Sequence, residues 1–220
     1  VFFAITWIGN SYLFNYLDNK LKKNLENKEV EAEGMLQHSG YYYKLTRFHG
    51  APKEVPKNLI IFKWQSYLTF ITGVLLLIII YYANAKILMM DSRVNANITP
   101  LMGIGISVFS IIGSWLIYDF ICKSKIINHK IIFPIVLLVI GTIIAFVLTK
   151  IYGPRFAFLS VGIILGCIMF FNVFFVIIPN GKNITSSAFN KTKLDLNLST
   201  QAKTRSVHNN VMTLLVLFTM

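Results

Sequence analysis

Long apolar runs alternate with short polar segments along the whole chain. A helix needs about 20 mainly apolar residues to cross the hydrocarbon core of a bilayer. Several runs reach or approach that length, and some of them, including 66–83 and 131–149, carry no charged residue. The runs are Val1–Leu17, Trp64–Ala83, Leu101–Phe120, Ile131–Thr149, Phe156–Ile178 and Val207–Met220. The pattern predicts an all-α integral membrane protein with about six transmembrane helices.

One segment between the first two runs has a different period. Charged residues alternate with small or apolar ones over 29–36, and 41–48 is rich in β-prone side chains. His38, Ser39 and Gly40 separate the two stretches and are typical of a turn. We therefore expect a small β-hairpin with His38 at its tip, inside a first polar loop that extends over 18–63.

Composition supports the membrane class, and charge predicts the orientation. The chain is 55% hydrophobic and 14% charged, which is too apolar for a soluble domain of 220 residues. Of the 21 Lys and Arg residues, 17 lie in loops 18–63, 121–130 and 179–206, against four in 84–100 and 150–155. Positive loops stay in the cytoplasm, so the first, third and fifth loops are predicted to be cytoplasmic. The basic excess then reflects topology rather than nucleic-acid binding.

Cysteines and chain ends add three expectations. Cys122 and Cys167 are too few for a disulfide framework or a metal-site pattern. No CxxCH motif occurs, so we expect no c-type haem attachment within this sequence. Both chain ends fall inside apolar runs, and we interpret residues 1–220 as a membrane domain truncated at both ends.

Polar side chains gather at the predicted cytoplasmic ends of the runs. They are Asp18, Lys63, Trp64, Tyr118, Asp119, Asn180, His208, Asn209 and Asn210, with Gly181 directly after Asn180. Snorkelling toward the headgroups explains Lys63 well. It explains an aspartate at an apolar helix end or a His-Asn-Asn run less well, because polar residues at membrane depth often mark function.

Several ordered segments of the chain resemble one family. They are "AITWIGNSYLFNYLDNKL", "EVEAEGMLQHSGYYY", "APKEVPKNLIIFKWQSYLTFITGVLLLIIIYY", "WLIYDFIC", "GCIMFFNVFFVIIPN" and "RSVHNNVMTLLVLFTM". This set is similar to the urate oxidase N-terminal membrane domain of the cytochrome c-linked urate oxidases, also called urate hydroxylases. The resemblance extends over essentially the whole chain.

The family's motifs fall on defined positions. The matches are Trp7, Ile8, Gly9, Ser11, Tyr12, Leu17, Asp18 and Asn19; His38, Gly40 and Tyr42; Phe62, Lys63 and Trp64; Trp115, Leu116, Tyr118 and Asp119; 172–179; and His208, Asn209 and Asn210. One departure concerns Ser160, which stands where the family pattern has a histidine before Val-Gly.

The resemblance implies an enzyme of purine degradation in the bacterial inner membrane. Such an enzyme oxidises urate to 5-hydroxyisourate and passes the electrons to a cytochrome c. In this family the cytochrome c domain follows the membrane domain, so we expect it to be absent from this chain. The haem of that domain or of a partner is the expected cofactor.

Urate chemistry suggests roles for the matched residues. Urate is planar and largely monoanionic at neutral pH, so its oxidation needs a base, donors for its carbonyl oxygens and an electron path. The predicted catalytic residues are His38, His208, Asp119 and Asp18, with a histidine as base and an aspartate orienting it. The predicted substrate-binding residues are Lys63, Trp64, Asn209, Asn210, Tyr118 and Tyr42, as anion partners, carbonyl donors and stacking rings.

Three alternatives stay open from the sequence. His38 and His208 are also the best candidates for ligands of a haem or metal inside this domain. A purine or urate transporter is compatible with six spans, Asn172 near mid-span and a GxxxG motif at 162–166, although no internal repeat is evident. A non-catalytic membrane anchor for a cytochrome is compatible with Ser160.

Overall fold

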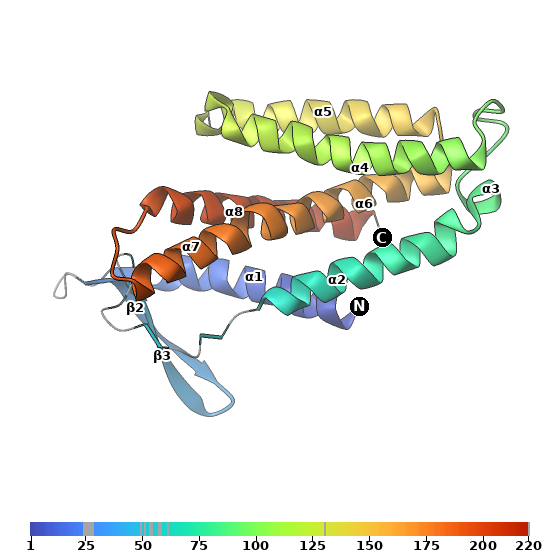
Figure 1. The fold of residues 1–220 in the computed structure, drawn as a ribbon. Coiled ribbons are helices and arrows are strands. Elements are labelled where there is room, and N and C mark those ends of the chain that lie inside the picture. The colour runs from blue at the N-terminus through green and yellow to red at the C-terminus, as the bar shows by residue number, and fades with distance from the viewer. Residues whose placement is uncertain are drawn as a thin grey trace. The chain divides into compact units, whose positions relative to one another are not determined.

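The computed structural model describes residues 1–23, 29–48, 50, 52, 55–56, 59–60, 62–129 and 131–219. These residues form a mostly helical chain with one small sheet (Figure 1). The contacts divide the chain into a first unit, 1–66 with 172–210, and a second unit, 67–171 with 211–220.

The first unit combines helices with the sheet. Its elements are α1 (Phe2–Lys20), β1 (Lys22–Lys23), β2 (Val30–His38), β3 (Tyr41–Phe48), the first turn of α2 (Lys63–Leu76), η3 (Val173–Ile177), α7 (Ile178–Phe189) and most of α8 (Leu196–Phe218). The strands pair antiparallel in the order β1-β2-β3. Figure 1 shows the hairpin of β2 and β3 beside the C-terminal end of α1.

The predicted hairpin is confirmed, with its turn where the sequence placed it. His38 pairs with Tyr41, and the two residues between them, Ser39 and Gly40, have φ angles of 50° and 85°. Positive φ at both central positions is the geometry of the two-residue turn that matches the twist of paired strands. Val30 and Ala32, at the opposite end of β2, are buried, and they define the face of the hairpin that points inward.

Gly40→Ala tests this turn. A side chain at φ 85° costs about 1 kcal/mol because its Cβ meets the following carbonyl. We expect the opening equilibrium of the β2–β3 hydrogen bonds, measured by amide hydrogen exchange, to rise about fivefold. Gly9→Ala is the matched control, because Gly9 is helical with open space around it and alanine favours a helix. Equal amide exchange in Gly40→Ala and the wild type would contradict a turn that needs positive φ at position 40.

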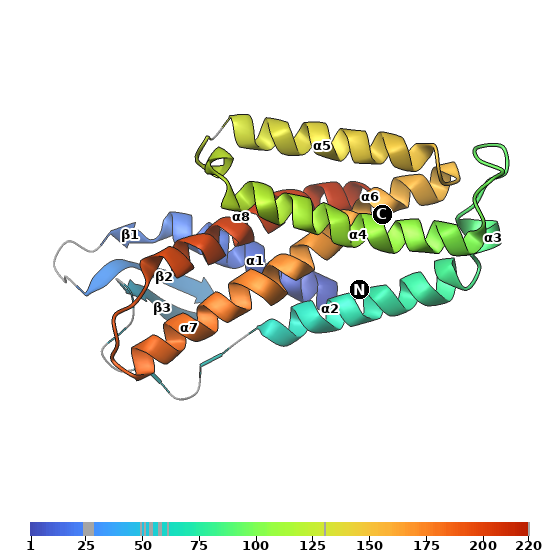
Figure 2. The same cartoon turned by 45° about the horizontal axis from the view of Figure 1, so that its top comes forward.

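The second unit is helical in its described residues. It contains the rest of α2, η1 (Leu77–Tyr82), α3 (Ala85–Leu88), α4 (Pro100–Lys123), η2 (Lys125–Asn128), α5 (Ile132–Thr149), nearly all of α6 (Pro154–Asn172) and the end of α8. Figures 1 and 2 both show α4 and α5 running side by side. Aromatic rings join α2 to the end of α6, where Phe70 stacks on Phe170 with centroids 3.8 Å apart.

Four helices of the described chain could cross a membrane by length and composition. They are Lys63–Tyr82, Pro100–Lys123, Ile132–Thr149 and Pro154–Phe189. The first and last predicted runs also form helices, α1 and α8, but these carry too many polar side chains to qualify by the same measure. Four spans thus have support, the first and sixth stay predictions, and Met220 lies outside the described residues.

Two boundaries near the C-terminus differ from the sequence-based ones. The predicted fifth run ends at Ile178, just before Pro179, yet the helix continues to Phe189. Pro179 cannot donate a backbone hydrogen bond, and the wider π-helical turn of η3 directly before it accommodates that loss. The last helix also begins earlier than predicted, at Leu196, so most of the predicted loop 179–206 is helical.

Candidate functional site

A cavity of about 920 Å³ lies within the first unit. Side chains of α1, the first turn of α2, η3, α7 and α8 form its wall, together with residues just before α2. Small-molecule sites usually measure about 300–1,000 Å³. The cavity is therefore large enough for a planar heterocycle with its first waters.

The charge of this cavity favours an anion. The charged side chains on its wall, among the described residues, are Asp18, Lys63, Lys182 and Lys203. Three cations against one carboxylate leave an excess of positive charge near the ligand space. Because the site lies partly inside protein, this field is screened less than it would be on an open surface.

Amide side chains add directional hydrogen bonding to the wall. Asn10, Asn15, Gln65 and Asn209 all line the cavity. Asn10 Nδ2 donates to Gln65 Oε1 at 2.8 Å, and this bond ties α1 to the start of α2. Ser11 Oγ donates to Asn210 Oδ1 at 2.6 Å, which ties α1 to α8. These two bonds connect α1, α2 and α8, which form three sides of the cavity.

Aromatic rings also line the cavity among the described residues. They are Trp7, Phe14, Phe62 and Phe189, from three different segments of the chain. Phe14 and Phe62 contact each other with ring centroids 5.9 Å apart. Rings beside amide and ammonium groups offer a stacking surface for a flat polar ligand.

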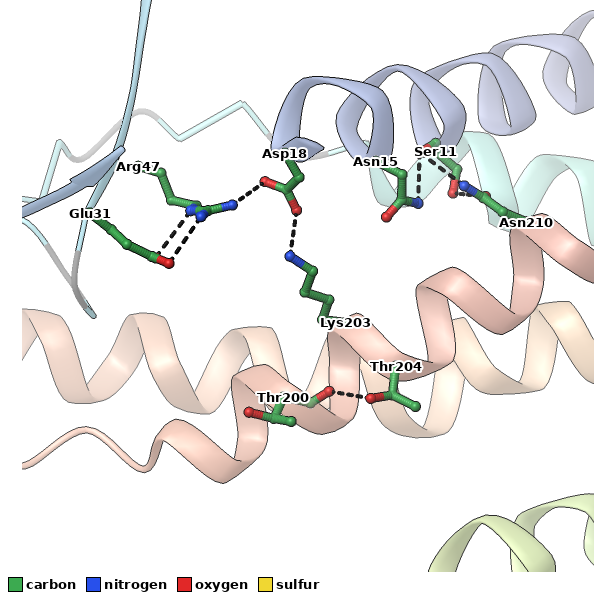
Figure 3. A network of polar contacts seen from close by, with 9 residues as sticks. All are labelled: Ser11, Asn15, Asp18, Glu31, Arg47, Thr200, Lys203, Thr204 and Asn210. Carbon is green, nitrogen blue, oxygen red and sulfur yellow. Dashed lines mark hydrogen bonds and ion pairs between the residues drawn. The ribbon is translucent and has the colours of Figure 1, made fainter. Parts of the chain in front are cut away.

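Asp18 joins the cavity to the hairpin through an ion-pair network (Figure 3). Its Oδ1 accepts from Arg47 Nη1 at 3.1 Å, and its Oδ2 accepts from Lys203 Nζ at 3.0 Å. Arg47 also binds Glu31 through two bonds of 2.9 and 3.0 Å. Burial lowers the pKa of the Arg47 guanidinium, but hydrogen bonds to Asp18 and Glu31 outweigh it, so that pKa lies above its ordinary value.

A family model described as urate oxidase N-terminal matches residues 1–220, the whole chain. The chain belongs to the urate oxidase N-terminal family. This membership confirms the resemblance and indicates a urate-related function and an oxidoreductase-type enzyme. The four apolar helices are consistent with membrane association of this urate oxidase N-terminal domain. Searches of curated proteins and of solved structures find no match.

Three of the predicted site residues of the urate oxidase domain line the cavity: Asp18, Lys63 and Asn209. Asn210 reaches the wall indirectly, because it accepts from Ser11 and its backbone carbonyl accepts from Tyr12 at 2.7 Å. The structure therefore gathers residues from positions 18, 63 and 209–210, which are far apart in the sequence.

Other predicted residues of the first unit lie away from the cavity wall. His208 is half-buried on α8 beside Asn209, but its side chain is not among those that line the cavity. Trp64 is 61% exposed and has Lys63 Nζ 5.8 Å from its ring centroid. His38 and Tyr42 are exposed at the hairpin tip.

The remaining predicted residues belong to the second unit. Tyr118 and Asp119 are both buried in α4. Asp119 Oδ2 lies 2.6 Å from Lys123 Nζ, one helical turn away. Ser160, the departure from the family pattern, is buried in α6, where its hydroxyl donates to the Phe156 carbonyl at 2.6 Å. That bond satisfies the serine within its own helix.

The described residues do not assemble a conventional metal-ligand set. No group of three or more His, Cys, Asp or Glu side chains in the described part of the chain is placed to hold a metal ion. Of the two predicted ligands, His38 is exposed at the hairpin turn and His208 lies on α8. Haem or metal ligation by these histidines stays a prediction.

Sequence reasoning missed several residues of the cavity. From the sequence, Lys182 and Lys203 are only topology signals; Arg47, which binds the lining residue Asp18 without lining the cavity itself, is only a loop charge. The amides Asn10 and Gln65 were not selected. A spacing signal was present beside Asn10: Ser11, Asn15 and Asp18 lie four and three residues apart, which places them on one face of a largely apolar helix, and Asn10 directly precedes Ser11.

Arg47→Gln tests the attachment of the hairpin to Asp18. The side chains of this network are about one-third exposed, so the ion pairs contribute about 1 kcal/mol or less. We expect exchange of the β2–β3 amides to increase up to about fivefold at low salt, with a smaller effect in 1 M salt. Lys44→Gln is the control, because Lys44 is 62% exposed in its pair with Glu33. If both variants exchange alike, Arg47 does not attach the hairpin.

Proposed function

We propose that this domain oxidises urate to 5-hydroxyisourate and that the electrons pass to a cytochrome c. Urate and one water give 5-hydroxyisourate, two protons and two electrons, and two ferricytochrome c molecules each take one electron. The family supports a urate-related oxidoreductase. The observation that carries the proposal is the cavity of the first unit, whose described wall residues include three lysines and four amide side chains.

The binding roles follow from the lining. Lys63 is the half-buried lysine of the three, so it is the strongest partner for the urate anion. Asn209 and the other amides can donate to the carbonyl oxygens of urate. The stacking surface comes from lining rings such as Trp7 and Phe62, in place of the predicted Trp64, Tyr42 and Tyr118.

The base is assigned to Asp18. It is the carboxylate on the cavity wall among the described residues. Each of its oxygens accepts one hydrogen bond from a cation, which leaves further lone pairs to take a proton from urate or from the attacking water. Arg47 and Lys203 hold the carboxylate in a fixed orientation. His208, the neighbour of Asn209, is the second base candidate.

The membrane setting completes the proposal. Lys and Arg are concentrated in the first, third and fifth loops, which favours the cytoplasmic side for those loops in a bacterial inner membrane. Asp18 and Lys63 bound the first loop, so urate would enter from the cytoplasm. The cytochrome c acceptor would be a fused domain or a separate protein.

Anaerobic turnover in membranes tests the function. Membranes with the expressed protein receive urate and ferricytochrome c, and both urate loss and cytochrome reduction are followed. We expect two cytochromes reduced per urate lost, and no reaction in membranes without the protein. Uptake of urate into sealed vesicles with no chemical loss would instead identify a transporter. If a folded preparation shows neither uptake nor chemical loss of urate, the result favours a membrane anchor.

A further inference from the structure

The outer half of the hairpin extends beyond the part that is packed. At its base, Val30 and Ala32 are buried. At the middle of β2, a Cβ added to Gly34 would lie 2.8 Å from the Leu21 side chain, so this level is still closely packed. Past it, all but one of the residues 35–44 are exposed. These residues form the hairpin tip, which is open to its surroundings.

The hairpin tip carries large apolar side chains on both of its faces. Residues directly opposite each other share a face, and successive residues of a strand alternate between faces. Tyr41 and Tyr43, 71% and 48% exposed, lie on one face. Met35 and Tyr42, 69% and 74% exposed, lie on the other. A protein partner docked on the sheet covers one face, whereas a fluid layer of lipid headgroups surrounds both.

The residue types of the tip also suit a lipid headgroup layer. Tyrosine combines an apolar ring with a hydroxyl and is enriched at membrane–water interfaces. The tip has three tyrosines and no Asp or Glu. Its cation, Lys44, is 62% exposed and 3.2 Å from Glu33, and Lys22 and Lys23 are exposed on the neighbouring strand β1. Exposed lysines beside a bilayer attract anionic headgroups.

The base of the hairpin lies within reach of the start of an apolar helix. Lys63–Tyr82 could cross a membrane, and Asn10 of α1 binds Gln65 at its start. Arg47 ties the hairpin to Asp18, eight residues further along α1, or about 12 Å. The nine residues of β2 extend about 30 Å, and Figures 1 and 2 show the hairpin turning back from the C-terminal end of α1. The tip can therefore return to the level at which the span begins.

We propose that the hairpin tip is a membrane-surface anchor, whose tyrosines and Met35 lie in the headgroup layer of the bilayer that the apolar helices cross. Anionic lipids are the favoured headgroups because the tip and the neighbouring strand present exposed lysines and the tip has no carboxylate. The inference goes beyond urate oxidation and does not rest on it, since it uses only the exposed hairpin and the apolar helices.

Fluorescence quenching by lipids with a nitroxide on the headgroup tests the anchor in the whole chain. Gln37→Cys, opposite Tyr42, receives the fluorophore, with Cys122 and Cys167 replaced by alanine. The protein is placed in nanodiscs of phosphatidylcholine mixed with phosphatidylglycerol. Lys23→Cys, an exposed site at the base of the sheet, is labelled as the matched control. We expect quenching at position 37 to be at least about threefold stronger than at position 23. Equal quenching at the two positions would overturn the anchor.

Removal of the rings tests which groups hold the tip in place. Tyr41→Ser combined with Tyr42→Ser keeps two hydroxyls and should lower quenching at position 37 to the level at position 23. Amide exchange of the inner β2–β3 ladder shows whether the hairpin is intact in this variant. With that exchange unchanged, quenching equal to that of the wild-type tip would overturn the role of the tyrosines.

Lipid charge and native membranes supply the remaining outcomes. Lys44→Gln should weaken quenching at position 37 in the mixed nanodiscs and leave it unchanged in phosphatidylcholine alone. Equal quenching of the wild type in both lipids would overturn the preference for anionic headgroups. A label at position 37 that iodide reaches in nanodiscs but not in native membranes would assign the tip to a protein partner and overturn the lipid anchor.

Discussion

Asp18→Asn is expected to lower kcat for urate oxidation at least about 100-fold. A positioned general base typically contributes about 10²–10⁴ in rate, and an amide cannot take the proton. Substrate binding should persist, because removal of the carboxylate makes the wall more positive toward an anion. Steady-state kinetics should therefore show a large loss in kcat with a KM equal to or below that of the wild type.

Glu31→Gln is the matched control for that result. Glu31 binds Arg47 in the same network, yet it is not among the residues that line the cavity. This variant removes a similar ion pair and should keep kcat within about threefold. Equal losses in Asp18→Asn and Glu31→Gln would mean that Asp18 acts only by holding the hairpin, and His208→Ala would then test the remaining base candidate.

Lys63→Met is expected to raise the KM for urate at least about tenfold, with a smaller effect on kcat. A charge-assisted contact to an anion in a partly enclosed site is worth about 1.5–3 kcal/mol, and a tenfold change corresponds to about 1.4 kcal/mol. The KM of the wild type should also rise with ionic strength, and this dependence should weaken in the variant.

Lys20→Met provides the comparison for Lys63→Met. Lys20 is an exposed lysine of α1 in the same unit and is not among the lining residues. Both variants lose one positive charge, so a general effect of net charge would appear equally in both. A KM for Lys63→Met that matches the wild type at low salt would remove Lys63 from the site.

Local features of the fold were accessible from the sequence. The hairpin was predictable because its turn depends on two adjacent residues, Ser39 and Gly40, and its strands on a period of two. Four of the six predicted spans also gain support, because length and apolar content, which the sequence shows directly, are enough to identify such helices. The helix that contains the fifth run continues past Pro179 to Phe189, and only the adjoining π-turn shows how the proline is accommodated.

The cavity was less accessible because distant segments build it. Asp18 could be selected as an acidic residue at an apolar helix end, but its partners Arg47 and Lys203 lie 29 and 185 positions further along. No local pattern distinguishes these two cations from those that set topology. The same holds for Arg205, which donates a hydrogen bond to Asn172 on another helix.

Substrate protection of an engineered cysteine tests most directly whether the cavity of the first unit binds urate. Ser206→Cys places a thiol on the cavity wall, and Ser199→Cys places one on the exposed face of the same helix. Both are made with Cys122 and Cys167 replaced by alanine, and modification by a polar thiol reagent is timed with and without urate. We predict that saturating urate slows modification at position 206 at least about tenfold and leaves position 199 unchanged. Equal rates at position 206 with and without urate, in a preparation that still oxidises urate, would contradict the account.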